Sequence, residues 1–216
     1  MKKIVLTTIL TISAAYAAAD NGLYVGVGAG YGTINTSTIN GNSFANGSSS
    51  QNGGNAAGGV YVGYDFSHYV GIQADYNYIA NVQYSTGYNA ITGSNSSFSA
   101  SQQIIDLGVT GHLPFSLFAN ALSGISVFGK LALGYSTTSF SGGTLLSQNV
   151  AGGSVNVPGS ASTLVPVIGA GAEYGIGQVG IRLEYDYIGN NNVSINNLNS
   201  MTTNNSLVLL SALYHF

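Results

Sequence analysis

Residues 179–188 read Val-Gly-Ile-Arg-Leu-Glu-Tyr-Asp-Tyr-Ile, and the two kinds of side chain alternate along this stretch. Successive side chains of a β-strand point to opposite faces, so every second residue shares a face. On one face the side chains are apolar or aromatic: Ile181, Leu183, Tyr185 and Tyr187. On the other face they are charged: Arg182, Glu184 and Asp186. The pattern predicts a strand that lies between an apolar medium and a polar interior.

The same alternation recurs in segments of roughly ten residues, the length of a strand that crosses a membrane. They lie near 22–32, 58–66, 69–79, 103–113, 124–136, 163–175, 179–189 and 206–216. No apolar run after the N-terminal segment approaches the ~20 residues of a transmembrane helix. The sequence therefore predicts an all-β protein, a closed antiparallel up-and-down transmembrane β-barrel of eight strands. Ten strands stay possible if part of 80–102 or 137–162 extends the sheet.

Every charged residue in these segments falls on the face opposite the apolar one. The set comprises Asp65, Asp75, Asp106, Lys130, Glu173, Arg182, Glu184 and Asp186. In a membrane barrel one face of each strand meets lipid, where an Arg or Lys at mid-membrane costs about 2–4 kcal/mol. These side chains are therefore predicted to form a charge network in the lumen.

Aromatic residues lie on the apolar face near strand ends, and glycines lie on the polar face. The aromatic residues are Tyr31, Tyr64, Phe66, Tyr78, Tyr135, Tyr174, Tyr187, Tyr214 and Phe216. Aromatic side chains favour the boundary between membrane and water, so two aromatic girdles are expected. The glycines are Gly26, Gly28, Gly30, Gly169 and Gly171. Because an eight-stranded barrel is only wide enough for side chains, these glycines are expected to leave room for larger groups opposite.

The connections between the segments alternate between long and short. The long ones, near 33–57, 80–102, 137–162 and 190–205, are rich in Asn, Ser, Gly and Thr and contain no charged residue. Short ones fall at 67–69 and 175–178, and one of intermediate length falls near 114–123. This layout is typical of outer-membrane barrels, which have long extracellular loops and tight periplasmic turns.

The N-terminal segment has the features of a signal peptide. Lys2 and Lys3 precede an apolar run to about Ile12, and an alanine-rich stretch follows. The prediction is a signal peptide over 1–19, cleaved after Ala17 or Ala19, and a barrel over 20–216. The chain has no Cys, which excludes disulfides. After cleavage two basic residues face seven acidic ones, a balance that gives no electrostatic footprint for nucleic acid.

Several stretches resemble the OmpA-like transmembrane domain and related small outer-membrane β-barrel surface antigens. They are 165–174, 181–185 and the final Tyr214-His215-Phe216, together with 69–76 and 127–131. The resemblance implies a lumen filled by a charge network rather than an open pore. Tyr214 and Phe216 look like the signal that the barrel-assembly machinery reads, although Ser211 stands where that signal usually has Gly. The implied partners are outer-membrane lipid and lipopolysaccharide, that machinery, periplasmic chaperones and a possible host surface ligand.

Two ion pairs are expected inside the barrel. If Tyr174 pairs with Val179 across a four-residue turn, Glu173 lies diagonal to Arg182 and within reach of it. Asp106 and Lys130 come together in a similar way. An unpaired charge inside would be expensive, so these pairs are expected to stabilise the barrel. A gating role for Arg182 or Lys130 is the alternative.

No catalytic, cofactor or metal site is expected. His68, His112 and His215 fall near the predicted periplasmic ends of strands, and the long loops contain no Asp or Glu. A hydrolase of the outer membrane needs a His within hydrogen-bond reach of a nucleophile, and a metal site needs closely spaced ligands. The expectation is therefore that the protein is not an enzyme.

The expected function follows from these features. The chain is expected to be a non-enzymatic barrel of the outer membrane of a Gram-negative cell, displaying flexible surface loops. It would contribute to envelope integrity and to surface contact, as an adhesin or antigen. A small-solute porin-like channel is the first alternative. A secreted soluble barrel of the lipocalin type, with its apolar side chains inside, is the second.

Overall fold

The computed structural model describes residues 22–39, 50–52, 55–89, 94–118, 124–141, 144–146, 154–156, 159–196 and 199–216. Eight long strands make up most of it: β1 (Gly22–Ile39), β3 (Asn55–Ser67), β4 (Val70–Asn89), β5 (Ser94–Pro114), β6 (Ile125–Ser141), β9 (Ser160–Ile176), β10 (Val179–Asn196) and β11 (Asn199–His215). A short strand, β2 (Ser50–Asn52), pairs with β4. The short strands β7 (Thr144–Leu146) and β8 (Ser154–Asn156) pair with each other, and η1 (Phe115–Leu117) is a 3₁₀ turn.

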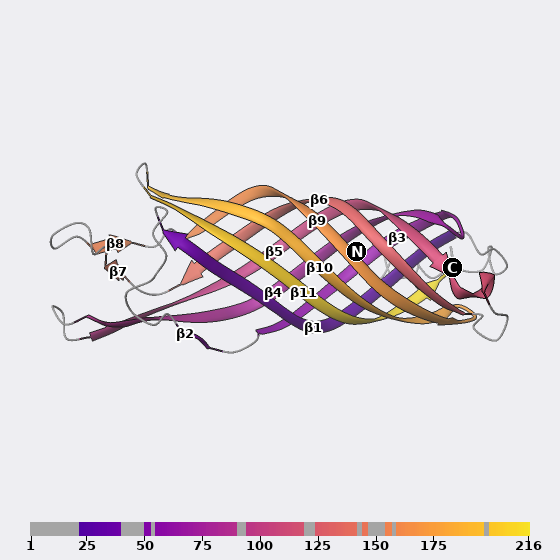
Figure 1. Cartoon of the computed structure of the whole chain (residues 1–216), viewed down its shortest axis with the longest axis horizontal. Coiled ribbons are helices and arrows are strands. Elements are labelled where there is room, and N and C mark those ends of the chain that lie inside the picture. Colours follow the sequence, from indigo (N-terminus) through magenta and orange to yellow (C-terminus); the bar gives the residue numbers. More distant parts are fainter. Residues whose placement is uncertain are drawn as a thin grey trace, which may run out of the picture.

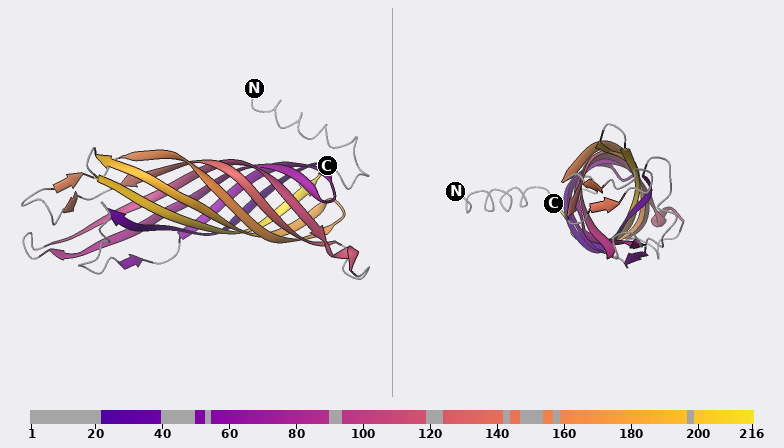
Figure 2. Two further views of the ribbon diagram at one scale, coloured as in Figure 1. Left: turned by 45° about the horizontal axis from the view of Figure 1, so that its top comes forward. Right: turned by 90° about the vertical axis from the view of Figure 1, so that its left-hand side faces the viewer.

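The long strands form a closed antiparallel barrel. Each pairs with its neighbours in the chain, β4 pairs with β5, and β1 pairs with β11 to complete the ring. Figure 1 shows the cylinder from the side, and the end-on view of Figure 2 shows the ring. The predicted eight-stranded up-and-down barrel is thus confirmed. Closure matters because a membrane offers no water to satisfy the backbone groups of an open sheet edge.

The register gives the barrel a steep stagger. Following hydrogen-bonded partners once around the ring from Gly22 leads through Asp65, Lys130 and Asp186 and returns to β1 at Gly32, ten residues further along that strand. An eight-stranded barrel has an interior that side chains alone can fill. The sequence positions that point inward therefore decide what the lumen contains.

The two ends of the barrel differ. At one end, called the turn end, lie the C-terminus, η1 and the short connections β3–β4 and β9–β10; the opposite end, where β4 and β5 extend furthest, is called the loop end (Figure 1). Among the described residues no helix is long and apolar enough to cross a membrane.

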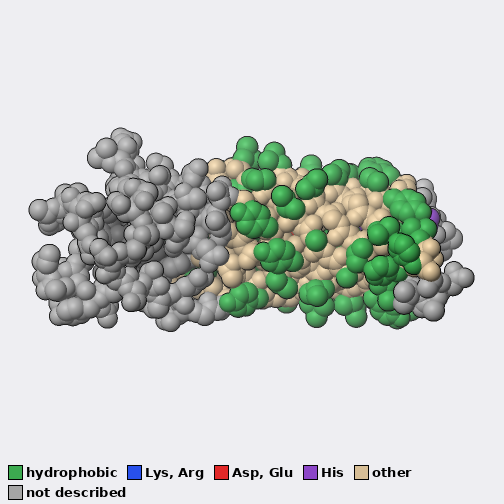
Figure 3. All heavy atoms as spheres, viewed as in Figure 1, with side chains coloured by type: hydrophobic (Ala, Val, Ile, Leu, Met, Phe, Trp, Pro, Cys, Tyr) green, Lys and Arg blue, Asp and Glu red, His purple; other side chains and the backbone are tan. Residues whose placement is uncertain are grey.

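The wall of the barrel is apolar outside and charged inside over most of its length. Leu107 and Leu131 point outward and are 63% and 61% exposed, whereas Lys130 and Arg182 point inward and are 1% and 0% exposed. On the face drawn in Figure 3, hydrophobic side chains stud the described wall and no charged side chain is visible. This arrangement suits a wall surrounded by lipid, and it is opposite to that of a lipocalin-type barrel.

Toward the loop end the polarity of the wall reverses. On β5 the inward residues change from Asp106 to Ile104, and the outward ones change from Leu107 and Ile105 to Gln103. The inward apolar residues form one cluster, the loop-end apolar cluster: Ile34, Ala57, Ile79, Val82, Ala100, Ile104, Phe140, Val165, Val167, Ile188, Leu207 and Leu209. Beyond the change the interior is mostly apolar, although Gln102 and Thr138 are also buried there, and the exterior is polar.

Four outward tyrosines mark the level of this reversal. These loop-end tyrosines are Tyr31, Tyr78, Tyr135 and Tyr187. On β10, for example, Tyr187 stands between inward Asp186 and inward Ile188. Aromatic side chains favour the membrane boundary. We therefore place one face of the membrane at these tyrosines, with the strands continuing beyond it into water.

The predicted loop boundaries were wrong because the strands run further than the alternation indicated. The range 80–102 was predicted as a loop, but β4 reaches Asn89 and β5 begins at Ser94. Most of 190–205 is likewise strand, and strands also occupy the margins of 33–57 and 137–162. In the part of β5 that fell in the predicted loop or next to it, Ala100 and Ile104 point inward and are buried, whereas the outward Gln103 is polar and exposed. An interpretation that assigns every apolar residue to the lipid face cannot recognise these extensions of the strands.

The membrane boundary can be tested with two arginines. Replacing Leu131 by Arg should lower the free energy of unfolding by about 2–4 kcal/mol, because the guanidinium would face acyl chains. Ser162→Arg, outward on β9 beyond the loop-end tyrosines, should change it by less than about 0.5 kcal/mol, as ordinary surface substitutions do. Urea titration in lipid vesicles, followed by gel mobility of the unheated protein, gives both values. Equal losses would contradict the boundary.

Candidate functional site

Arg182 organises the lumen near the turn end. Its Nε and Nη2 donate hydrogen bonds to Glu173 Oε2 at 3.0 and 2.9 Å, and its Nη1 donates to Gln73 Oε1 at 2.6 Å. Arg182 on β10 and Glu173 on β9 are direct partners in the register. Charge-assisted bonds of this kind are stronger than neutral ones, and two of them fix the plane of the guanidinium.

Three aromatic rings surround the same guanidinium. Its Cζ lies 5.3 Å from the ring centre of Tyr24, 5.0 Å from that of Tyr61 and 4.5 Å from that of Phe128. Each distance is within the range of a cation–π contact, which gains strength when the cation is desolvated. The rings and the carboxylate together replace the water that Arg182 loses on burial.

Two of these rings fit into the lumen because glycines lie opposite them. Tyr24 lies opposite Gly63 in the register, and Tyr61 lies opposite Gly26. A Cβ at either glycine would collide with the ring of its partner. The predicted inward role of Gly26 is thus confirmed, and the group that fills its space is aromatic.

Lys130 organises the middle of the lumen. Its Nζ donates a hydrogen bond to Asp186 Oδ2 at 2.9 Å and lies 2.8 Å from Glu184 Oε1. Asp75 Oδ2 and Asp106 Oδ1 lie further away, at 3.5 and 3.9 Å. One ammonium therefore lies among four carboxylates, which come from β4, β5 and β10.

Gly169 allows Lys130 to reach its nearest partners. Lys130 on β6 lies opposite Gly169 on β9, and Gly169 lies opposite Asp186 on β10. A Cβ at Gly169 would collide with Asp186 Oδ1 and would come within 3.2 Å of Lys130 Cε. The Lys130–Asp186 ion pair thus spans β9, and it can do so because Gly169 has no side chain.

Gln73 links the two charged groups into one network. Its Oε1 accepts hydrogen bonds from Tyr24 Oη at 2.7 Å and from Arg182, and its Nε2 donates to Asp75 Oδ1 at 2.8 Å. Asp75 in turn faces Lys130. The Gln73 amide bonds both to Arg182 and to Asp75, which faces Lys130. The side chains around Arg182 and those around Lys130 therefore hold one another in place.

Two histidines lie beside carboxylates near the turn-end mouth. His215 Nε2 is 3.3 Å from Glu173 Oε1, and its ring lies 5.4 Å from that of Tyr24. His112 Nε2 is 3.7 Å from Asp65 Oδ1, and its ring stacks on that of Phe128 at 5.7 Å. Each histidine therefore continues the packed side chains of the lumen toward the mouth of the barrel.

The eight charged residues predicted for the lumen all point into it. Seven of them belong to the network around Arg182 and Lys130, and Asp65 pairs with His112 instead. The register behind the Glu173–Arg182 pair was wrong by two residues. Val179 pairs with Ile176, not with Tyr174, so the turn has two residues. Gly177, with φ at +61°, supplies the left-handed backbone that such a tight turn requires.

The network predicted from the sequence contained only charged residues and left out its uncharged and aromatic members. Alternation puts Gln73 on the face of Asp75, and it would place Tyr61 on the face of Asp65 in the same way. Tyr24 shares the face of Gly26 in the same way. The predicted girdles covered only outward aromatic residues, and the inward Tyr24 and Tyr61 were given no role.

Tyr214 and Phe216, predicted as an assembly signal, lie on the outer face at the seam. The Tyr214 hydroxyl donates to Gln178 Oε1 at 3.0 Å, and the two rings are 5.0 Å apart. The Phe216 N–H donates to the carbonyl of Leu23 at 2.9 Å, next to the β1–β11 ladder. The last residue of the chain therefore takes part in closing the ring.

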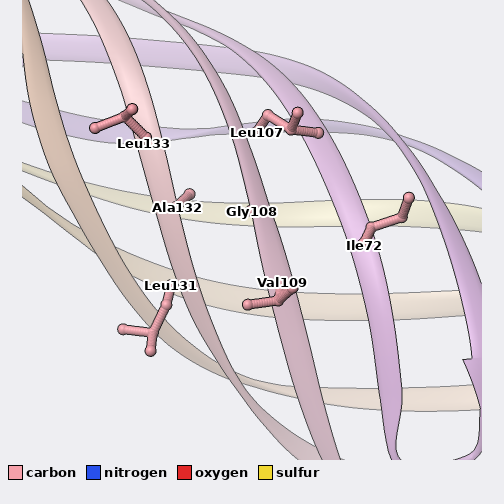
Figure 4. Close-up of a pocket in the computed structure, with 7 residues that line it drawn as sticks. All are labelled: Ile72, Leu107, Gly108, Val109, Leu131, Ala132 and Leu133. Atoms are coloured by element: carbon pink, nitrogen blue, oxygen red, sulfur yellow. The ribbon is translucent and has the colours of Figure 1, made fainter.

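A shallow hollow lies on the outside of the wall, across β4, β5 and β6. Its lining comprises Ile72, Leu107, Gly108, Val109, Leu131, Ala132 and Leu133. Figure 4 shows the larger side chains standing around the positions of Gly108 and Ala132. With an apolar lining and no polar side chain, the hollow suits acyl chains rather than a substrate.

The arrangement in the lumen can hold charge and exclude water. Arg182, Tyr24 and Lys130 are among the largest side chains that are fully buried. The loop-end apolar cluster lies beyond them as a second layer. Among the described residues no three His, Cys, Asp or Glu side chains are grouped so that they could hold a metal ion.

Comparison with known families gives one match. A family model described as outer membrane protein beta-barrel domain matches residues 4–216. No curated protein sequence matches the chain.

Comparison with solved structures gives small barrels at low sequence identity. The outer membrane protein OprG from Pseudomonas aeruginosa is 14% identical with a TM-score of 0.55, covering 90% of this chain and 96% of its own. Neisserial surface protein A is 13% identical with a TM-score of 0.49, covering 90% and 97%. Ail of Yersinia pestis, in complex with the heparin analogue sucrose octasulfate, is 14% identical with a TM-score of 0.48, covering 92% and 100%.

The network can be tested by removing its central cation. Lys130→Met should lower the free energy of unfolding by about 3–5 kcal/mol, because the carboxylates around it would lose their buried partner. Adding Asp186→Asn to Lys130→Met should restore part of this loss, since one uncompensated carboxylate is then gone. Urea unfolding in vesicles gives the values. A double variant no more stable than Lys130→Met would contradict the network.

Proposed function

Because the chain belongs to the outer membrane protein β-barrel domain family, we propose that it is a sealed, non-enzymatic barrel that displays its loop end at the cell surface. In this role it contributes to envelope integrity and to contact with other surfaces, as an adhesin or antigen. The observation that carries the proposal is the complete burial of Arg182 and Lys130, which lie across a lumen that side chains fill.

The filled lumen favours this role over that of a small-solute channel. A channel needs a continuous watery path, and an eight-stranded barrel has little room for one. Here a solute would have to displace the Arg182 network and then the loop-end apolar cluster. Opening the first layer would separate Arg182 from Glu173 inside a medium of low dielectric, which is costly. A gating role for Arg182 or Lys130 would require both layers to move.

The polarity of the wall supports an orientation with the loop end outward. The strands extend beyond the loop-end tyrosines with a polar outer face, so this part suits water rather than lipid. At the turn end the connections β3–β4 and β9–β10 are short. Extracellular segments longer than periplasmic ones are the rule in this class of barrel.

The partner of the loop end is a neutral surface, such as a sugar or an uncharged protein face. The ranges 33–57, 80–102, 137–162 and 190–205 contain no charged residue, and Lys130 and Arg182 both point into the lumen. Recognition of a polyanion would need a basic patch. Hydrogen bonds from Ser, Thr, Asn and Gln therefore carry the proposed contact.

Export and assembly complete the proposal. Residues 1–19 act as a signal peptide, removed after Ala17 or Ala19, and periplasmic chaperones deliver the chain to the barrel-assembly machinery. That machinery reads Tyr214 and Phe216, whose outward position at the seam supports this role. In the membrane the apolar wall then contacts lipid and lipopolysaccharide.

The sealed lumen can be tested by electrical recording. The protein in planar lipid bilayers should show no steady, reproducible openings, because its lumen side chains exclude water and ions. A general porin incorporated in the same way serves as the positive control. Uniform conductance steps from the purified protein would contradict the sealed barrel and would favour the channel.

The neutral contact can be tested by trimming and by salt. Cells whose protein lacks 40–54, 90–93, 142–159 and 197–198 should adhere less, while their resistance to detergent stays unchanged because the barrel remains. Adhesion by the full-length protein should persist when sodium chloride is raised, since exposed charge pairs are what salt screens. Loss of adhesion in high salt, or equal adhesion by the trimmed protein, would overturn the proposal.

A further inference from the structure

The connection between β5 and β6 differs from the other two at the turn end. Between β3 and β4, Ser67 Oγ accepts hydrogen bonds from the N–H groups of Tyr69 and Val70, both at 3.2 Å, which keeps the turn tight. Between β9 and β10 lies the two-residue turn described above. After β5 the chain instead passes from Pro114 into η1 and re-enters the sheet at Ile125.

This connection exposes large apolar side chains. Leu117 is 56% exposed and Phe118 is 70% exposed. The ring of Phe118 lies 6.2 Å from that of Phe115, so the apolar groups are adjacent. Exposed apolar groups that lie next to one another mark a site of contact, because burying them is favourable.

The position of η1 points to lipid as the occupant. In the end-on view of Figure 2 its coil lies outside the ring of strands rather than across the mouth of the lumen. Leu113, which points outward from the wall just before η1, and Phe66 at the same end are also exposed. The apolar surface of η1 is therefore continuous with the wall that faces lipid.

The charge of the connection fits the same occupant. Residues 113–129 contain no Asp, Glu, Lys or Arg. A segment that enters the boundary between headgroups and acyl chains must give up hydration, and charged side chains would oppose this. Amphipathic segments with Phe and Leu on one face bury that face at this depth.

We propose that η1, through Leu117 and Phe118, inserts into the inner phospholipid leaflet of the outer membrane and anchors the barrel at its turn end. The contact restrains how deeply the barrel sits, because η1 lies outside the ring of strands and carries its exposed apolar side chains at the end of the wall. A protein partner in the periplasm would instead leave these side chains in water when the barrel is alone in lipid.

The absence of Trp from the chain allows a direct test. Three single-tryptophan proteins are purified and reconstituted in phosphatidylethanolamine–phosphatidylglycerol vesicles that also contain brominated phosphatidylcholine. Phe118→Trp reports on η1, Leu131→Trp is the reference in mid-membrane, and Ser160→Trp is the reference in water. A gel-mobility shift on heating shows that each has folded, and Leu117→Trp replaces Phe118→Trp if that variant fails.

The two outcomes are distinct. Insertion predicts that Phe118→Trp emits at shorter wavelength than Ser160→Trp, that bromine near the headgroup end of the acyl chain quenches it more than bromine near the chain terminus, and that aqueous iodide quenches it weakly. Emission and iodide quenching equal to those of Ser160→Trp, with no quenching by brominated lipid, would overturn the anchor.

Discussion

Closure of the sheet determines the strand pairing, the width and the contents of this barrel. A strand edge in lipid would leave backbone N–H and C=O groups without partners, so β1 must meet β11 and β4 must meet β5. Eight strands with a ten-residue stagger then enclose a narrow interior. Several large inward side chains fit because a neighbouring strand has a glycine at that position, as Lys130 does opposite Gly169. The pairing of charges inside follows from a space that admits little water.

The reversal of wall polarity shows that the barrel meets two solvents. Between the loop-end tyrosines and the turn end the surroundings are acyl chains, and the apolar side chains point outward. Beyond the tyrosines the surroundings are aqueous, and Ile34, Val82 and Phe140 point inward instead. The hydrophobic effect selects the face that avoids water in each part. One continuous sheet can follow both rules because alternate residues always face opposite ways.

Most of what could be predicted from the sequence came from the alternation of inward and outward side chains along each strand. Alternation placed eight strands and sent Arg182 and Glu184 inward, since only one face of a strand can tolerate charge in lipid. Register was harder, because moving a turn by two residues keeps every side chain on its face. The Glu173–Arg182 contact could therefore be predicted from a pairing that was itself wrong. The contact between Lys130 and Asp186 could not, because it crosses an intervening strand and depends on Gly169.

The lumen contains two layers that resist water for different physical reasons. Around Arg182 and Lys130 the charges are held by opposite charges, and Arg182, Lys130 and Glu173 also by hydrogen bonds, so the layer depends on its partners staying in place. The loop-end apolar cluster has no such dependence, and it resists water because hydrating its side chains is unfavourable. The apolar layer also keeps bulk water away from the charged layer, which strengthens the ion pairs below it. The narrow barrel thus keeps its charges inside, with the apolar layer between them and the loop end.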